Sequence, residues 1–168
     1  MRRILKRREF VADDWRHLGE EGGDGTGNSP LIVPLAEFRT HIEKWRAYAG
    51  PLGVRLAPAD PAEELAADIQ RLSLVASEFP TAGEGRGYTQ GRLVRSRLRF
   101  TGELRAVGAG VKQDLLFIMS RCGFDSFELA AGQKEDEALK ALDRYTVAYQ
   151  PAEAVPSIKQ QRFFVEAR

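Results

Sequence analysis

The sequence predicts a single α/β domain in which consecutive strand–helix units build a mostly parallel sheet. Between residues 30 and 147, short apolar runs alternate with segments whose apolar residues recur at helical spacing. The pattern is clearest over residues 72–129, where strand-like runs enclose helical segments. Parallel strands joined by right-handed crossovers are the expected result. The pattern fits an open sheet and a partial barrel equally well.

Composition divides the chain into three parts. Residues 1–29 form an N-terminal arm and a flexible glycine-rich loop, residues 30–147 form the strand–helix core, and residues 148–168 form an extended tail. Within the arm, Ile4 and Phe10 flank a basic turn at Lys6-Arg7-Arg8, which predicts a short hairpin. A solvated hairpin and a basic arm that contacts an acidic partner are both compatible with this cluster.

The elements of the core follow from periodicity and from the residues that interrupt it. Strands are expected at residues 30–35, 53–57, 72–79, 102–108 and 126–129, and helices at 36–48, from 60 onward, at 90–100, 113–122 and 134–145. In the helix over 113–122, the residues expected on the core side are Leu115, Leu116, Ile118 and Met119. Gly123 then ends that helix as its C-cap.

Composition also excludes several classes of function. The 168 residues carry a net charge of +1, so the overall charge does not indicate a nucleic-acid partner. The single cysteine, Cys122, excludes an internal disulfide and an all-cysteine metal site. We therefore expect no metal and no cofactor. The position of Cys122 at a helix end favours a small buried thiol over the alternative, a nucleophile. No apolar run has transmembrane length and the N-terminus lacks a signal-peptide core, so a cytoplasmic location is expected.

A polar site is predicted around the strand over residues 102–108. Glu103 and Arg105 lie on one face of this strand, where a parallel sheet normally carries apolar residues. Glu78 ends the preceding strand, Arg86 follows it in the next loop, and Asp125 precedes the next strand. These five residues are the candidate site. In the alternative interpretation, Glu78 only forms an ion pair with Arg86 or Arg105 and orients the loop.

The turn before the third helix is a candidate anion-binding loop. Gly85, Arg86 and Gly87 allow close approach of the backbone, and Thr89 can cap the helix that follows. The pattern is neither a Walker motif nor a dinucleotide fingerprint. A glycine-rich turn without a ligand is the alternative.

Arginines give the helix over residues 90–100 its most distinctive face. Arg92, Arg95 and Arg99 recur at helical spacing, opposite Gly91, Val94 and Leu98. The stripe is either a solvated face or a docking surface for an acidic partner or anionic ligand. Aromatic residues are not interleaved with it, which argues against nucleic acid.

Three motifs together resemble a small bacterial family of unknown function: Gly85-Arg86-Gly87-Tyr88, Gly102–Ala106 and Arg121–Asp125. Its members are often described as oxidoreductases probably involved in sulfite reduction, because their genes lie beside that of the sulfite reductase hemoprotein. The chain departs from the family pattern at Glu84, Ala109 and Gln113-Asp114. If Ala109 replaces a functional carboxylate, this copy has altered activity.

The resemblance implies a pathway and leaves the mechanism open. We expect an accessory protein of assimilatory sulfite reduction that docks on a redox enzyme, with the sulfite reductase hemoprotein as the possible partner. The alternative is a small anion-binding enzyme that acts on a sulfur oxyanion or a phosphorylated metabolite. Whether the protein is an enzyme, and its oligomeric state, do not follow from the sequence.

Overall fold

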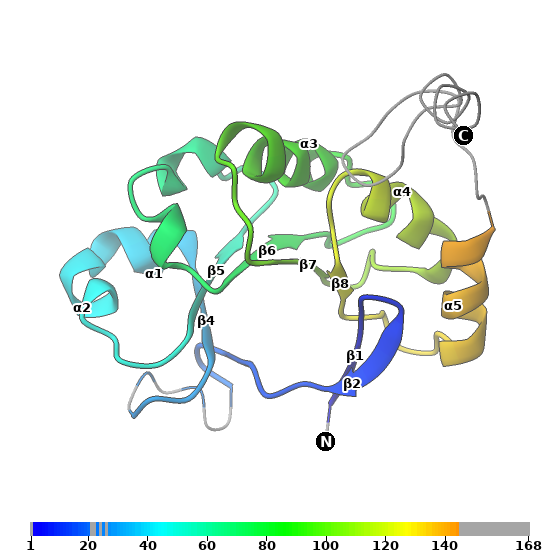
Figure 1. The fold of residues 1–168 in the computed structure, drawn as a ribbon, viewed down its shortest axis with the longest axis horizontal. Coiled ribbons are helices and arrows are strands. Elements are labelled where there is room, and N and C mark those ends of the chain that lie inside the picture. Colours follow the sequence, from blue (N-terminus) through cyan, green and yellow to red (C-terminus); the bar gives the residue numbers. More distant parts are fainter. Residues whose placement is uncertain (1, 21–22, 24, 26, 145–168) are drawn as a thin grey trace, which may run out of the picture.

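An eight-stranded sheet forms the centre of the computed structural model, which describes residues 2–20, 23, 25 and 27–144 (Figure 1). The strand order is β2–β1–β8–β7–β6–β5–β4–β3. The strands are β1 (Arg3–Lys6), β2 (Glu9–Ala12), β3 (Arg16–His17), β4 (Leu31–Pro34), β5 (Leu52–Leu56), β6 (Leu74–Glu78), β7 (Glu103–Val107) and β8 (Ser126–Phe127). Neighbours from β3 to β8 are parallel, whereas β1 is antiparallel to β2 and β8. This arrangement confirms the predicted single α/β domain.

The sheet curls like part of a barrel. β2 and β3 lie at its two edges, yet only Asp13, Asp14 and Trp15 separate them in the chain. Eight strands in a flat sheet would place the edges about 34 Å apart. The four residue steps from Ala12 to Arg16 span at most about 14 Å. The edges must therefore approach one another, and Figure 1 shows this segment crossing from the hairpin to β4.

Helices cover the outer face of the curled sheet (Figure 1). They are α1 (Leu35–Thr40), α2 (Ile42–Arg46), α3 (Arg86–Arg92), α4 (Leu116–Arg121) and α5 (Glu135–Asp143), with a π-helical turn over Leu93–Arg97 and 3-10 turns over Ala62–Leu65, Ile69–Arg71 and Gln113–Leu115. The outward residues of each strand pack against these helices in the main core, which includes Val54, Val75 and Leu104. Burial of this apolar surface is the dominant stabilising contribution.

The inner face carries a smaller core and a polar cluster. Ile32, Leu74, Ala76 and Val107 form a second apolar cluster, against which Trp15 packs. The segment that joins the two sheet edges thus also covers the inside of the sheet. Beside this cluster, Glu103 and Arg105 project from β7 to the same face.

The N-terminal hairpin is as predicted. β1 and β2 pair from Arg3↔Ala12 to Lys6↔Glu9, which leaves Arg7 and Arg8 as the turn. The two-residue strand β3 was not predicted, because Arg16 and His17 give no alternation long enough to recognise. The predicted tail at 148–168, and part of the predicted loop at 19–29, lie outside the described residues.

Several helix predictions need correction. The helix expected from residue 60 onward is instead two 3-10 turns, Ala62–Leu65 and Ile69–Arg71. The helix expected over 36–48 is interrupted at His41, whose φ and ψ of −123° and 43° are not helical. The helix expected over 90–100 begins earlier, at Arg86, and its second half is π-helical. Ile118 was assigned to the core, but it is 50% exposed, because α4 turns this position towards solvent.

Candidate functional site

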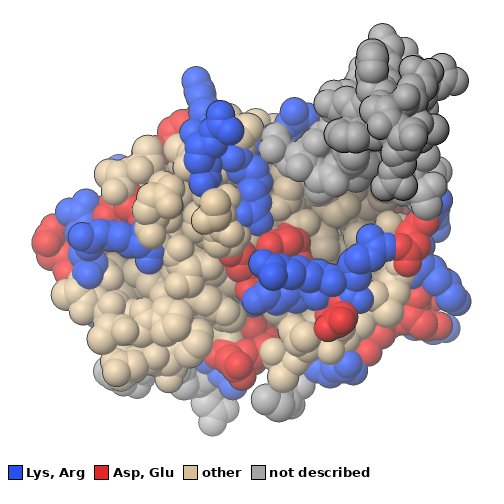
Figure 2. Space-filling view, viewed as in Figure 1, with Lys and Arg blue, Asp and Glu red and all other residues tan. Residues whose placement is uncertain are grey.

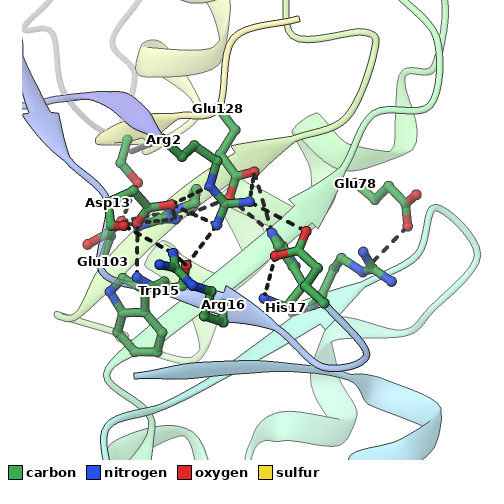
Figure 3. Close-up of polar contacts among 12 residues, drawn as sticks. Arg2, Asp13, Trp15, Arg16, His17, Glu78, Glu103 and Glu128 are labelled. Carbon is green, nitrogen blue, oxygen red and sulfur yellow. Dashed lines mark hydrogen bonds and ion pairs between the residues drawn. The ribbon is translucent and has the colours of Figure 1, made fainter. Parts of the chain in front are cut away.

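A buried ionic cluster lies on the inner face of the sheet, where Figure 3 shows Asp13, Glu103 and Glu128 close together. Arg105 is at the centre of this cluster. Its Nε and Nη2 donate to Glu103 Oε1 at 2.8 and 2.6 Å. Its Nη1 donates to both carboxylate oxygens of Asp13 at 3.1 Å and to Glu128 Oε1 at 3.1 Å. One fully buried guanidinium therefore binds three carboxylates, and we call these four residues the ionic centre.

Further polar side chains surround the ionic centre. Arg2 Nε donates to Asp13 Oδ2 at 2.8 Å, and Arg2 Nη1 lies 3.5 Å from Glu128 Oε2. Lys6 Nζ forms an ion pair with Glu103 Oε2, and the Ser126 hydroxyl donates to Glu103 Oε1 at 2.7 Å. The three cations Arg2, Lys6 and Arg105 thus balance three carboxylates.

His17 connects the two ends of the sheet through this cluster. It belongs to edge strand β3, whereas Glu128 follows β8 on the other side. Nevertheless, His17 Nε2 lies 3.1 Å from Glu128 Oε1. Its Nδ1 is buried and has no hydrogen-bond partner among the described residues. This contact across the interior is direct evidence that the sheet is curled.

The ionic centre keeps the Glu103 and Glu128 carboxylates charged. Burial alone would raise the pKa of Glu103, but the charge of Arg105 and hydrogen bonds from Lys6, Ser126 and Arg105 lower it below its usual value. Burial also opposes ionisation of Glu128. The hydrogen bond and charge of His17, with the charges of Arg2 and Arg105, outweigh that effect and lower its pKa to about 2. Burial lowers the pKa of Arg105, yet the facing carboxylates raise it overall.

Such a cluster is suited to holding structure. A general base needs a pKa near the working pH, and the depressed pKa values of Glu103 and Glu128 make them poor proton acceptors at neutral pH. Arg105 already uses its donors on three carboxylates. The centre instead ties the N-terminal segment, through Asp13, to β7 and to Glu128 beyond β8. We found no group of side chains that could hold a metal ion within the described part of the chain.

Acid should destabilise the protein through these carboxylates. The unfolded-state pKa of Glu128 is near 4.5 and the folded-state value is about 2, so its contribution is present above pH 4.5 and is lost as the pH falls towards 2. That contribution is on the order of 3 kcal/mol. We expect urea melts at pH 6 and pH 3 to show this loss. The control variant Glu128→Gln should show a smaller drop, and an equal drop would contradict the assignment.

The five residues of the predicted polar site do not form one cluster. Glu103 and Arg105 belong to the ionic centre, but Glu78 contacts neither Arg105 nor Arg86. Its Oε2 lies 3.9 Å from Nε of Arg55, on the neighbouring strand β5. Glu78 was expected to pair with one of two arginines from the loop and from β7. The parallel register places Arg55 beside Ala76, within reach of Glu78, which explains the correction.

Asp125 is a structural partner at the start of β8. Its Oδ1 accepts the Leu104 amide at 2.8 Å, and its Oδ2 lies 3.4 Å from Arg95 Nη2. Burial raises its pKa, and the hydrogen bond from Leu104 and the charge of Arg95 only partly oppose that rise. The residue therefore connects β7, β8 and the segment after α3, and it lies outside the ionic centre.

The candidate anion loop already holds a carboxylate. Glu84 Oε1 accepts the backbone N–H of Arg86 at 3.0 Å and its Nε at 2.9 Å. The hydrogen bonds from Arg86 lower the pKa of Glu84 to about 2. Gly87 serves packing, since a Cβ there would lie 2.5 Å from the Phe79 ring. Gly85 has open space around it, Thr89 is exposed, and α3 begins at Arg86 without the predicted Thr89 cap.

The predicted arginine face is divided by the π-helical turn. Arg95 turns inward, where its Nε donates to Gly123 O at 3.0 Å and its Nη1 donates to Phe100 O and Gly102 O at 2.8 and 2.7 Å. Arg92 and Arg99 remain exposed. Neither side chain forms an ion pair or hydrogen bond with any residue that the structure describes. The docking candidates are thus reduced from three residues to two.

Sequence reasoning missed Asp13, His17 and Glu128 as members of the cluster. Asp13 lies in a connecting segment, His17 in a two-residue strand that the sequence does not reveal, and Glu128 directly after β8. A buried carboxylate beside Trp15 gives no periodic signal. The unpaired charges of Glu103 and Arg105 on a buried strand were the one sequence signal that partners existed.

Comparison with known families shows which family the chain belongs to. Residues 53–158 match a family described as bacterial protein of unknown function, DUF934. The chain belongs to this family. The DUF934 match begins in β5, so it omits the hairpin and the segment that carries Asp13 and His17.

A search of curated proteins gave no match. Among the described helices, none combines the length and the apolar character needed to cross a membrane. The DUF934 match confirms the resemblance to a small bacterial family of unknown function.

Proposed function

We propose that this protein is a cytoplasmic accessory factor of assimilatory sulfite reduction that docks on a redox enzyme through exposed arginines. The pathway comes from the family resemblance, with the sulfite reductase hemoprotein as the partner. The docking role is supported by Arg92 and Arg99, which are exposed and form no ion pair with described residues. Figure 2 shows Lys and Arg side chains projecting from the surface around α3.

The packing on the inner face of the sheet supports recognition of a partner at the outer surface rather than a binding site inside the sheet. In enzymes with parallel barrels, side chains at the carboxyl ends of strands face an open mouth. Here Arg105, Asp13 and Trp15 fill part of the inside of the sheet. Unpaired exposed cations are then the most available recognition groups, and complementary charge mainly favours fast and specific association.

The second candidate, an enzyme or binding protein for a small oxyanion, has weaker support. Its loop would need the exposed amides beside Arg86, but the Glu84 carboxylate accepts one of them. A ligand would have to displace this carboxylate. A melting-temperature increase with sulfite, sulfate or phosphate at millimolar concentration would favour this candidate.

Docking can be tested by measuring association with the sulfite reductase hemoprotein at micromolar concentration and low salt. We expect Arg92→Glu/Arg99→Glu to weaken binding at least about tenfold, since like charges at an interface are repulsive. The control Arg39→Glu/Arg71→Glu reverses two other exposed arginine charges and should bind within about twofold of the wild type. Failure of the wild-type protein to associate would exclude this partner.

A further inference from the structure

The turn between β1 and β2 has an unusual sequence for its backbone conformation. Arg7 and Arg8 alone connect the two strands, and their φ angles are 48° and 71°. A type I′ hairpin turn requires positive φ at both positions and therefore favours Asn and Gly. Arginine has a Cβ that crowds the backbone in this region. Residues held in unfavourable backbone regions are concentrated at functional sites, which makes this turn a candidate.

A third arginine shares this conformation. Among the described residues, those other than glycine with positive φ are Arg7, Arg8 and Arg99, the last with a φ of 55°. Arg99 follows the π-helical turn after α3. At each of these positions, the local backbone disfavours the residue that is present.

Short contacts connect the turn to the segment that carries Arg99. The Arg7 amide donates to Asp125 O at 2.9 Å, and Asp125 Oδ2 lies 3.4 Å from Arg95 Nη2. Arg95 Nη1 in turn donates to the carbonyl of Phe100, the neighbour of Arg99, at 2.8 Å. The hairpin turn and Arg99 therefore flank the same end of the sheet, where β7 and β8 begin.

The turn is held rigidly and its side chains face solvent. β1 pairs with both β2 and β8, and the Lys6↔Ser126 pair lies directly beside the turn. Arg8 forms an exposed ion pair with Asp143. Arg7 is exposed and its side chain makes no hydrogen bond or ion pair with a described residue. Figure 2 shows Lys and Arg side chains lying across the hairpin. The backbone of the turn is fixed in this way, so binding does not have to order it.

We propose that Arg7, Arg8 and Arg99 form a surface that recognises carboxylates on an acidic segment of a partner protein. Guanidinium groups bind carboxylates in a bidentate fashion, which a lysine ammonium cannot do. Nucleic acid is disfavoured, because none of the aromatic side chains that the structure describes is exposed for stacking: Phe10 lies under Arg3 and Phe100 is buried. The part of this surface that Arg99 forms rests on the proposed docking role. The surface as a whole does not depend on which protein supplies the acidic segment.

A variant that carries the residues favoured by this turn conformation tests the effects of the arginines on binding and on stability separately. The variant Arg7→Asn/Arg8→Gly should raise the melting temperature by about 4–8 °C, because the backbone strain is relieved. It should weaken binding of a fluorescent decaglutamate peptide at low salt at least about tenfold. Arg99→Gln should weaken the same binding without stabilising the protein as much as the turn variant does. The control Arg39→Gln/Arg71→Gln also removes two charges and should change binding less than about twofold.

The other outcomes each decide a different part of the proposal. No binding of decaglutamate to the full-length wild type, or equal binding by the turn variant, would overturn it. Tighter binding of a thymidine 20-mer than of the peptide would replace the protein partner by a nucleic acid. A lower melting temperature in the turn variant would contradict the strain argument. If peptide binding depends on the turn while the sulfite reductase hemoprotein fails to bind, this surface stands and only the proposed partner is wrong.

Discussion

Arg105→Met is expected to lower the free energy of unfolding by about 3–5 kcal/mol. Methionine fills much of the same volume but leaves Asp13, Glu103 and Glu128 without the cation that they share. Removing one partner of a buried ionic group costs far more than the group contributes net, because the remaining charges stay desolvated. A domain of this size has about 5–15 kcal/mol of stability in total. Urea melts measure the loss directly.

The loss should grow with pH. In the wild type, the pKa values of Glu103 and Glu128 are lowered in the folded state. Burial raises the pKa of Glu103, and Arg105 makes the largest contribution to lowering it. We therefore expect the pKa of Glu103 in the variant to rise above the unfolded value, so that the folded variant holds more protons than its unfolded chain. Its stability therefore falls as pH rises, so the deficit is larger at pH 8 than at pH 5. The exposed control Arg97→Met should lose less than about 1 kcal/mol. A deficit independent of pH would show that the carboxylates reach water.

Asp13→Ala is expected to cost about 3 kcal/mol and to release the segment that joins the two edges of the sheet. Asp13 accepts hydrogen bonds from Arg2, from Arg105 and from the Trp15 amide, and its side chain is fully buried. Its loss removes the main polar attachment of residues 12–17 to β7. Faster hydrogen exchange in this segment than in β5 and β6 would report that release.

The neighbouring residue provides a control for this variant. Asp14 is exposed and precedes Trp15 in the same segment. Asp14→Ala should change stability by less than about 0.5 kcal/mol and leave hydrogen exchange as in the wild type. If Asp13→Ala behaves like Asp14→Ala, then Asp13 does not hold the segment in place.

The parallel core could be predicted from the sequence, because its strands are apolar runs with clear boundaries. The strand β7 was recognised from residues 102–108, and the charges of Glu103 and Arg105 correctly marked it as exceptional. The curl could not be predicted. It depends on the three-residue connection between β2 and β3, and β3 is too short to give a periodic signal.

The partners within the site could not be predicted for a related reason. Arg105 binds Asp13, which is 92 positions away in the sequence, and nothing local to Asp13 indicates burial. The arginine stripe failed differently. Regular helical spacing placed Arg95 beside Arg92 and Arg99, but the π-helical turn rotates it towards the carbonyls of Phe100 and Gly102.

The central structural claim is that the N-terminal segment completes the curled sheet through the Asp13–Arg105 interaction. A double-mutant cycle with Asp13→Ala and Arg105→Met, followed by urea unfolding at pH 7, tests it most directly. The account predicts a coupling free energy of at least about 2 kcal/mol, because each variant strands the same charges that the other removes. Additive effects, within about 0.5 kcal/mol, would show that Asp13 and Arg105 do not interact in the folded protein.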